Sequence, residues 1–324
     1  MADQPILLDV QNLRKTFRVG RGKTLYAVDD VSFAIRRGET LGLVGESGCG
    51  KTTVGRTLVR LYTPDAGKIL LDGEDIAGYT ARQIRRAHLP RRMQMIFQDP
   101  YASLNPYFTV GEIIGEGLEL HHIGKNREER MERVYALLDQ VGLHREHANR
   151  FPHEFSGGQR QRVGIARALA MDPEFIVCDE ATSALDVSVQ AQVMNMLIDL
   201  KKERNLTYLV VAHDLSLVRY ISDRVAVMYL GKIVEIGDVR SVYDTPRHPY
   251  TIGLLDAVPV ADPDYEATHD VRLMQGDIGS PINPGPGCRF ASRCPYATEQ
   301  CRRETPPLAS AGGDHSVACF HPVV

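Results

Sequence analysis

The chain has 324 residues, of which 43% are hydrophobic and 24% charged, and its formal net charge is −3. This composition is ordinary for a globular protein of about two domains, and the near-neutral charge gives no support for nucleic-acid binding. No apolar run approaches the roughly 20 residues of a membrane-spanning helix, and the N-terminal residues lack the basic and apolar regions of a signal peptide. We therefore expect a cytoplasmic protein that meets a membrane only through a partner.

Hydrophobic periodicity predicts an α/β core that is interrupted by a helical insert. In chain order we expect strands at 6–10, 31–35 and 41–44, a helix at 53–61, a helical subdomain at about 100–165, a strand at 175–178, a helix at 188–204 and a strand at 206–212. From about residue 257, prolines and glycines accumulate and the periodicity fades, which indicates a boundary. The predicted domains are 1–256 and 257–324.

A glycine-rich segment lies between the predicted strand at 41–44 and the helix that follows. It reads Gly45-Glu46-Ser47-Gly48-Cys49-Gly50-Lys51-Thr52 and continues with Thr53. Glycines let backbone N–H groups turn onto phosphate oxygens, and the helix N-terminus adds partial positive charge. Lys51 is placed to reach the β- and γ-phosphates, and Thr52 to put its hydroxyl on Mg²⁺. The spacing predicts the P-loop of an NTPase.

A pair of carboxylates ends the second apolar strand. Asp179 and Glu180 directly follow residues 175–178, at the strand end where α/β sheets bind ligands. Asp179 suits the coordination shell of Mg²⁺, and Glu180 is placed to polarise the attacking water. An isolated Asp-Glu pair is usually solvated surface, but the preceding P-loop favours the catalytic interpretation.

The segment at 155–162 reads Phe155-Ser156-Gly157-Gly158-Gln159-Arg160-Gln161-Arg162. It is a second anion cradle, because Ser156 can cap a helix while the two glycines bare their N–H groups. This segment closely resembles the signature of ABC ATPases, with Phe155 where Leu is commoner. The resemblance covers about residues 6–250 and implies ATP and Mg²⁺ as ligands.

Other family elements stand in the expected order. Gln98 resembles the Q-loop glutamine that senses Mg²⁺ and water, Asp186 closes a segment similar to the D-loop, and His213 resembles the switch histidine at the γ-phosphate. For the aromatic ring that stacks on adenine we expect Phe17, with Tyr26 as the second candidate. In this family two ATPase domains sandwich two ATPs, so the single P-loop and single signature imply a second ATPase subunit.

The C-terminal segment indicates which group of ABC ATPases the chain resembles. Residues 247–251 (Arg-His-Pro-Tyr-Thr) and 280–288 are similar to the extension of the dipeptide/oligopeptide permease ATPases. The whole chain then resembles the second ATPase subunit of a peptide importer. That resemblance implies a paralogous ATPase partner, two transmembrane permease subunits, an extracytoplasmic solute-binding protein and a place at the cytoplasmic face of the cell membrane. Importers of nickel or glutathione are the alternatives within the same subfamily.

Four cysteines gather near the C-terminus with the spacing C-x5-C-x6-C-x17-C, namely Cys288, Cys294, Cys301 and Cys319. A cytosolic chain rarely uses disulfides, so the cluster indicates a metal site. The absence of a short Cys pair favours an iron–sulfur cluster over zinc, and unligated thiols are the third option. The resemblance also implies a 4Fe–4S cluster. His315 and His321 could substitute as ligands, but we expect them at the surface.

The prediction is therefore an α/β P-loop ATPase core of the ABC type, with a helical subdomain and a small cysteine-rich C-terminal domain. The expected function, which the resemblance implies, is ATP hydrolysis that powers import of dipeptides or oligopeptides. A soluble ABC ATPase is the rival from another class. DNA-repair types carry a long coiled coil between Q-loop and signature, and Gln98 and Ser156 lie too close together for one. Ribosomal types carry two cassettes, and this chain has one.

Overall fold

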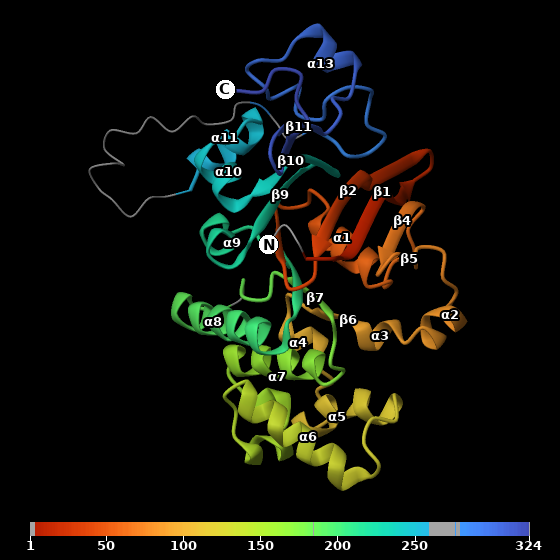
Figure 1. The fold of residues 1–324 in the computed structure, drawn as a ribbon, viewed down its shortest axis with the longest axis vertical. Coiled ribbons are helices and arrows are strands. Elements are labelled where there is room, and N and C mark those ends of the chain that lie inside the picture. The colour runs from red at the N-terminus through yellow and green to blue at the C-terminus, as the bar shows by residue number, and fades with distance from the viewer. Residues whose placement is uncertain (1–3, 184, 259–275, 277–278, 324) are drawn as a thin grey trace, which may run out of the picture. The chain divides into compact units, whose positions relative to one another are not determined.

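The computed structural model describes residues 4–183, 185–258, 276 and 279–323. The chain divides into two compact units, Met1–Gly78 with Val211–Val324, and Tyr79–Val210 (Figure 1). The domain bounds expected from the sequence differ from this division and stay a prediction. No helix in the described ranges is long and apolar enough to cross a membrane.

The first unit combines the two ends of the chain. Its N-terminal elements are β1 (Ile6–Gly20), β2 (Lys23–Arg36), β3 (Thr40–Val44), α1 (Lys51–Leu58), β4 (Ala66–Leu71) and β5 (Glu74–Asp75). Its C-terminal elements are α9 (Leu215–Ile221), β9 (Arg224–Tyr229), β10 (Lys232–Asp238), α10 (Val239–Asp244), α11 (Pro249–Asp256), α13 (Glu299–Arg303), β11 (Ala309–Gly312) and β12 (His315–Val317).

One sheet of this unit runs in the order β2-β1-β4-β5. β1 and β2 form a long antiparallel pair with several register shifts, and both strands extend well beyond the short strands expected at 6–10 and 31–35. The polar residues in the second half of β1 hide this extension, because they break the apolar alternation by which strands are recognised. Gly22 has φ +69 in the turn that joins the two strands.

The other strands of the first unit run in the order β11-β12-β10-β9-β3. β3 and β9 are parallel, and both are buried. An apolar cluster beside them contains Val44, Val227, Tyr229, Tyr250 and Phe290, each no more than 1% exposed. The core therefore joins the strand before the P-loop to residues from the far end of the chain.

The second unit contains short strands, of which β7 (Phe175–Asp179) and β6 (Met93–Ile96) are parallel, and most of the long helices. Its strands run in the order β8 (Thr207–Val211, whose last residue belongs to the first unit), β7 and β6. Its helices are α2 (Ala81–Arg86), α3 (Leu89–Arg92), α4 (Pro100–Ser103), α5 (Val110–Leu120), α6 (Arg127–Gln140), α7 (Gly157–Leu169) and α8 (Val187–Arg204), with 3-10 turns at Arg145–Asn149 and Pro152–Glu154.

Local sequence explains the helices of the second unit. Thr109 opens α5 through a reciprocal capping box with Glu112, and Asn126 caps α6 by accepting from the N–H of Glu129. The apolar faces of these helices are buried where α5 contacts α6 and α7. α8 spans 187–204 and so nearly matches the helix expected at 188–204.

The four C-terminal cysteines do not form the predicted 4Fe–4S cluster. Among the described residues, no group of three or more His, Cys, Asp or Glu side chains can hold a metal ion. The prediction of a cluster is wrong, and zinc is not supported either. Instead Cys288 and Cys294 pack against the apolar cluster of β9 and α11, as small hydrophobic side chains do. Burial raises the pKa of Cys288 to about 11 and also raises the pKa of Cys294 and Cys319.

The C-terminal segment does not fold as a separate domain that needs a metal to stabilise it. Phe290 is 1% exposed and contacts the rings of Tyr229 and Tyr250, while β12 pairs with β10. The segment shares the core of the first unit, so a separate cysteine-rich domain is not confirmed. His315, expected at the surface, is buried, and its Nε2 lies 2.7 Å from a carboxylate oxygen of Glu235.

Candidate functional site

The P-loop joins the buried strand β3 to helix α1. Gly45 has φ +148 and Gly50 has φ +111, and Gly50 stands at the N-terminus of α1. A Cβ at Gly45 would lie 2.1 Å from the carbonyl oxygen of Met228, and one at Gly50 would lie 2.0 Å from that of Ala27. Only glycine fits both positions, so β2 and β9 shape the loop from two sides.

The lysine of the loop is held against the loop's own backbone. Lys51 is 4% exposed, and its Nζ donates to the carbonyl oxygens of Gly45 at 2.7 Å and Glu46 at 3.1 Å. Its Nζ also lies 3.8 Å from the sulfur of Cys49. Burial raises the pKa of Cys49 against the opposing charge of Lys51, so this thiol is neutral. The loop therefore holds the Lys51 ammonium against its own carbonyl oxygens, beside a neutral thiol.

In the second unit, Glu180 follows β7 with an uncommon backbone conformation. Its φ is +45, a region that non-glycine residues adopt rarely and mostly at functional sites. Gln98 Nε2 donates to Glu180 Oε2 at 2.6 Å, and the N–H and hydroxyl of Ser183 both donate to the Glu180 carbonyl. The side chain and the backbone of Glu180 are therefore both fixed by neighbours. Asp179, one residue earlier, is fully buried.

The signature segment opens α7 as its sequence suggests. Ser156 Oγ accepts from the N–H of Gln159 at 3.3 Å, and the Gln159 side chain accepts from the N–H of Ser156 at 3.0 Å. A Cβ on Gly158 would lie 2.4 Å from Val189, whereas one on Gly157 would meet its nearest neighbour at 3.5 Å. There is therefore no room for a side chain at Gly158 beside Val189, and the first two positions of α7 carry no side chain.

Asp186 caps the next helix, α8, by accepting from the N–H of Val189 at 2.9 Å and the hydroxyl of Ser188 at 2.7 Å. These hydrogen bonds, that from the Ser188 hydroxyl first, lower the pKa of Asp186. Ala184, within the predicted D-loop, lies outside the described residues.

The predicted site residues fall into two groups. The first unit carries the P-loop with Ser47, Gly48, Thr52 and Thr53, as well as Phe17 and the exposed His213. The second unit carries Gln98, Asp179, Glu180, Asp186 and the signature. Within the second unit the structure brings Gln98 and Glu180 into direct contact. Phe17 packs edge-on against Tyr62, with ring centroids 5.5 Å apart, while the second candidate, Tyr26, donates its backbone N–H to Pro281.

Sequence reasoning missed two contacts on the P-loop. The backbone N–H of Glu46 donates to the hydroxyl of Tyr250 at 2.9 Å, and Arg293 Nη1 lies 3.1 and 3.0 Å from the two carboxylate oxygens of Glu46. Nothing local in the sequence signals either contact, since the partners are 204 and 247 residues apart.

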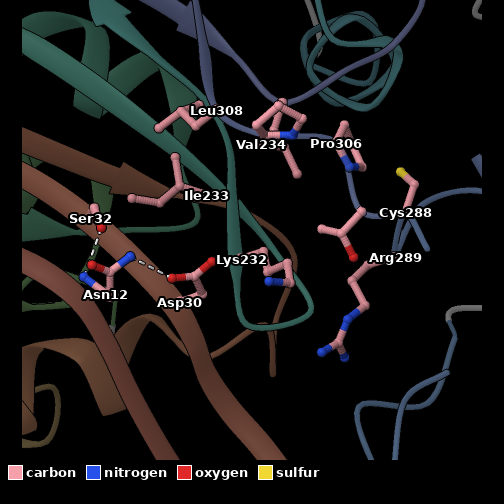
Figure 2. Close-up of a pocket in the computed structure, with 13 residues that line it drawn as sticks. Asn12, Asp30, Ser32, Lys232, Ile233, Val234, Cys288, Arg289, Pro306 and Leu308 are labelled. Atoms are coloured by element: carbon pink, nitrogen blue, oxygen red, sulfur yellow. Dashed lines mark hydrogen bonds between the residues drawn. The ribbon is translucent and has the colours of Figure 1, made fainter. Parts of the chain in front are cut away.

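A separate pocket of about 320 Å³ lies in the first unit (Figure 2). Asn12, Asp30 and Ser32 line it on one side, where Asn12 bonds to the other two, and Cys288 and Pro306 line it on another. The cations on its wall, Lys232 and Arg289, both lie within ion-pair distance of Asp29. Because those charges are already engaged, the pocket offers little to a charged ligand.

Comparison with known proteins places these features in a family. Residues 28–183 match the ABC transporter family, and residues 234–301 match the oligopeptide/dipeptide transporter C-terminal region. The chain is 60% identical over 260 residues to the oligopeptide transport ATP-binding protein OppF of Bacillus subtilis (strain 168), which covers 80% of this chain and 85% of that protein. The chain belongs to the ABC transporter family.

Two further comparisons describe this ABC ATPase. It is 51% identical over 313 residues to the putative oligopeptide transport ATP-binding protein YkfD of the same organism, covering 97% of this chain and 94% of the relative. A solved dimeric ATP-binding cassette, in a post-hydrolysis state with ADP and Pi, matches with a TM-score of 0.66 and 30% identity over 72% of this chain and 99% of its own. Structural likeness thus covers the cassette, and sequence likeness continues through the C-terminal region.

Proposed function

We propose that this ABC ATPase hydrolyses ATP to power import of dipeptides or oligopeptides across the cytoplasmic membrane. The observation that carries the proposal is the combination, in one chain, of a P-loop with an enclosed lysine and a C-terminal region that matches oligopeptide and dipeptide transporters. The relatives compared above are named for oligopeptide transport, which favours peptides over the nickel and glutathione alternatives.

In this proposal the first unit binds the triphosphate. Gly48 faces open space where a side chain would otherwise stand, which leaves room for phosphate oxygens against the backbone, and α1 directs its N-terminus at them. Lys51 exchanges its carbonyl partners for phosphate oxygens. Phe17 stacks on adenine, and His213 contacts the γ-phosphate.

The residues that would hold Mg²⁺ supply suitable donors. Thr52 offers a hydroxyl, Gln98 an amide oxygen and Asp179 a buried carboxylate, and these are hard oxygen ligands of the kind that Mg²⁺ prefers. When bound, the ion would neutralise charge on the β- and γ-phosphates. Thr52, Gln98 and Asp179 would orient the oxygens of the β- and γ-phosphates and exclude water from them.

Glu180 is the proposed general base. Its carboxylate orients a water molecule and takes its proton as the bond from the water oxygen to the γ-phosphorus forms. The bond from that phosphorus to the β–γ bridging oxygen breaks in the same step, so that ADP leaves and phosphate is the other product. Gln98 holds that carboxylate through the 2.6 Å hydrogen bond, and the Glu180 backbone is fixed by Ser183. A preorganised carboxylate needs no reorganisation at the moment of reaction, which is the main source of such catalysis.

The signature acts on a nucleotide held by another chain. In the ABC arrangement Ser156, Gly157, Gly158 and Gln159 face the γ-phosphate at the P-loop of a partner, with Asp186 beside the same junction. A paralogous ATPase subunit, two transmembrane permease subunits and a solute-binding protein complete the proposed complex at the cytoplasmic face of the membrane. The chain itself never meets the peptide, so the permeases and the binding protein choose the solute.

The test is uptake by the assembled transporter in proteoliposomes. Labelled di- and oligopeptides should accumulate only with ATP, and a complex that carries Glu180→Gln should bind ATP without transporting. Nickel and glutathione, offered to the same vesicles, should not accumulate. ATP-dependent uptake of either one, with no peptide uptake, would overturn the peptide assignment while keeping the ATPase.

A further inference from the structure

The phosphate loop of this chain contains an acidic side chain. Glu46 directly follows Gly45 and is only 22% exposed. An ionised carboxylate in a partly buried loop that binds a polyanion is unfavourable, because like charges repel more strongly where water is excluded. Something must compensate that charge if the loop is to bind a triphosphate.

The compensating group comes from the C-terminal region. Arg293 Nη1 lies 3.1 Å from Glu46 Oε1 and 3.0 Å from Glu46 Oε2, so one guanidinium nitrogen spans both carboxylate oxygens. The Arg293 side chain is only 7% exposed. Its guanidinium carbon also lies 5.9 Å from the ring centroids of Tyr229 and Phe290, which favours the cationic form.

The same region holds the backbone of the loop. Tyr250 is fully buried, and its hydroxyl accepts from the N–H of Glu46 at 2.9 Å. The rings of Tyr229, Tyr250 and Phe290 contact one another with centroids 4.6 to 5.5 Å apart. This aromatic cluster places Arg293 and the Tyr250 hydroxyl on the same loop residue, which couples the loop to residues that the cassette alone does not contain.

We propose that Arg293 is a positioning residue for ATP, which neutralises Glu46 and so lets the phosphate loop accept the triphosphate. The C-terminal region then does more than extend the cassette, because it completes the electrostatics of the nucleotide site. This inference rests on the proposed function, in that the loop must bind ATP for its charge to matter.

The charge mechanism separates variants that a structural role would not separate. Arg293→Ala leaves the Glu46 carboxylate uncompensated and should weaken ATP binding by about tenfold, because removal of one member of a buried pair leaves the other charge to repel the ligand. Arg293→Lys keeps the charge and should lose less. Glu46→Gln removes the repulsion itself and should bind ATP at least as tightly as wild type.

The experiment measures the Kd of ATP for the full-length chain by titration calorimetry, together with KM and kcat in the assembled transporter. The decisive variant is the double substitution Glu46→Gln with Arg293→Ala. If charge is the mechanism, the double variant recovers most of the ATP affinity that Arg293→Ala loses. Arg293→Ala alone should raise the KM for ATP more than it lowers kcat. Arg303→Ala is the matched control, since Arg303 belongs to the same region and its pair with Glu299 is exposed.

Two results would overturn the inference. One is an Arg293→Ala variant that binds ATP as wild type does. The other is a double variant no better than Arg293→Ala, which would mean that the arginine only holds the fold together. Should Arg293→Ala not fold, Arg293→Lys and Glu46→Gln still test the order of affinities. Lys51→Ala distinguishes this inference from the proposed function. Failure of the wild-type chain to bind ATP would refute the proposed function. Weaker ATP binding by Lys51→Ala, together with unchanged ATP binding by Arg293→Ala, would refute only this inference.

Discussion

The hydroxyl of Tyr250 accepts a hydrogen bond from the backbone N–H of Glu46 at 2.9 Å, across 204 residues of sequence. A tyrosine on helix α11 thereby occupies one backbone donor of the phosphate loop. Burial raises the pKa of this tyrosine, so its hydroxyl stays protonated. A hydrogen bond therefore joins the nucleotide site to the C-terminal region, and substitutions in either one should affect ATP binding.

Catalysis should depend on Glu180 more than nucleotide binding does. Glu180→Gln keeps the size of the side chain but removes the base, so turnover in the assembled transporter should fall by about a hundredfold or more. The Kd of ATP should change little, because the P-loop is untouched. Glu203→Gln, an exposed carboxylate on α8, is the control. Turnover within a few-fold of wild type would remove Glu180 from its role.

The signature should act in trans. Ser156→Arg places a bulky cation where a partner's γ-phosphate is expected, and it should abolish hydrolysis at the site whose P-loop belongs to the other subunit. Ser156→Ala removes the capping hydroxyl, at a cost of about 1 kcal/mol in folding free energy, but it adds no bulk, so it should retain more turnover than Ser156→Arg. Hydrolysis measured separately at the two P-loops, in a complex of the Ser156→Arg chain with the wild-type paralogous subunit, reports which site fails. A defect confined to the chain's own P-loop would contradict the arrangement.

Stability should depend strongly on Asp29. Its carboxylate lies 2.6 Å from Arg289, 3.1 Å from Arg14 and 3.5 Å from Lys232, and both Asp29 and Arg289 are about nine-tenths buried. Burial lowers the pKa of Arg289 in spite of the opposing charge of Asp29. Asp29→Ala should lower the free energy of unfolding by about 3–5 kcal/mol, because it leaves a buried cation without its counter-charge.

A surface pair offers the comparison. Asp314 lies 3.2 Å from Arg36 but is 51% exposed, so Asp314→Ala should cost about 1 kcal/mol or less. Denaturant unfolding of both variants, followed by circular dichroism, measures the difference. Equal effects from the two substitutions would show that the Asp29 cluster contributes no more than a surface pair.

Acid sensitivity should come in part from His248. Burial lowers the pKa of His248 to about 3, whereas the unfolded chain keeps a pKa of about 6.5. Between these values the unfolded state binds the proton and the folded state does not, so stability is fully present above about pH 6.5 and declines toward pH 3, by about 1.4 kcal/mol per pH unit at most.

His248→Asn isolates this contribution. The ring Nδ1 accepts from the N–H of Tyr250 at 3.0 Å to cap α11, and asparagine also caps helices well. Unfolding free energies measured at pH 5 and pH 7 should therefore differ less in His248→Asn than in wild type, while the other titrating groups cancel. An unchanged difference would mean that His248 does not titrate in this way.

Local patterns in the sequence were sufficient for the elements that carry the site. The β3, P-loop and α1 succession was predictable because Gly45, Gly50 and Lys51 act on the backbone near them. The helix α8 was predictable because an apolar stripe follows the cap of Asp186. Family membership followed from the signature at 155–162, and the comparisons confirmed it. The individual roles of the site residues stay predictions.

Contacts between residues far apart in the chain could not be predicted from the sequence. No local pattern predicts that Arg293 forms an ion pair with Glu46, or that Phe290 packs in the core beside Tyr229. The failed iron–sulfur prediction has the same origin. Cysteine spacing suggested a metal, but the spacing does not reveal that Cys288 and Cys294 lie against an apolar cluster that already stabilises the segment.

The turn between β1 and β2 is completed by residues that are synthesised very late. Asn283 accepts from the N–H of Thr24 at 2.9 Å and donates to the Gly22 carbonyl at 2.7 Å, and Ile282 forms a bridge with Leu25. Thr24 and Asn283 are 259 residues apart. At about 5–20 residues per second of translation, the first hairpin waits on the order of ten to fifty seconds for these partners. A ribosome that stalls before Asn283 would release a chain with an incomplete hairpin edge, a ready substrate for chaperones and proteases.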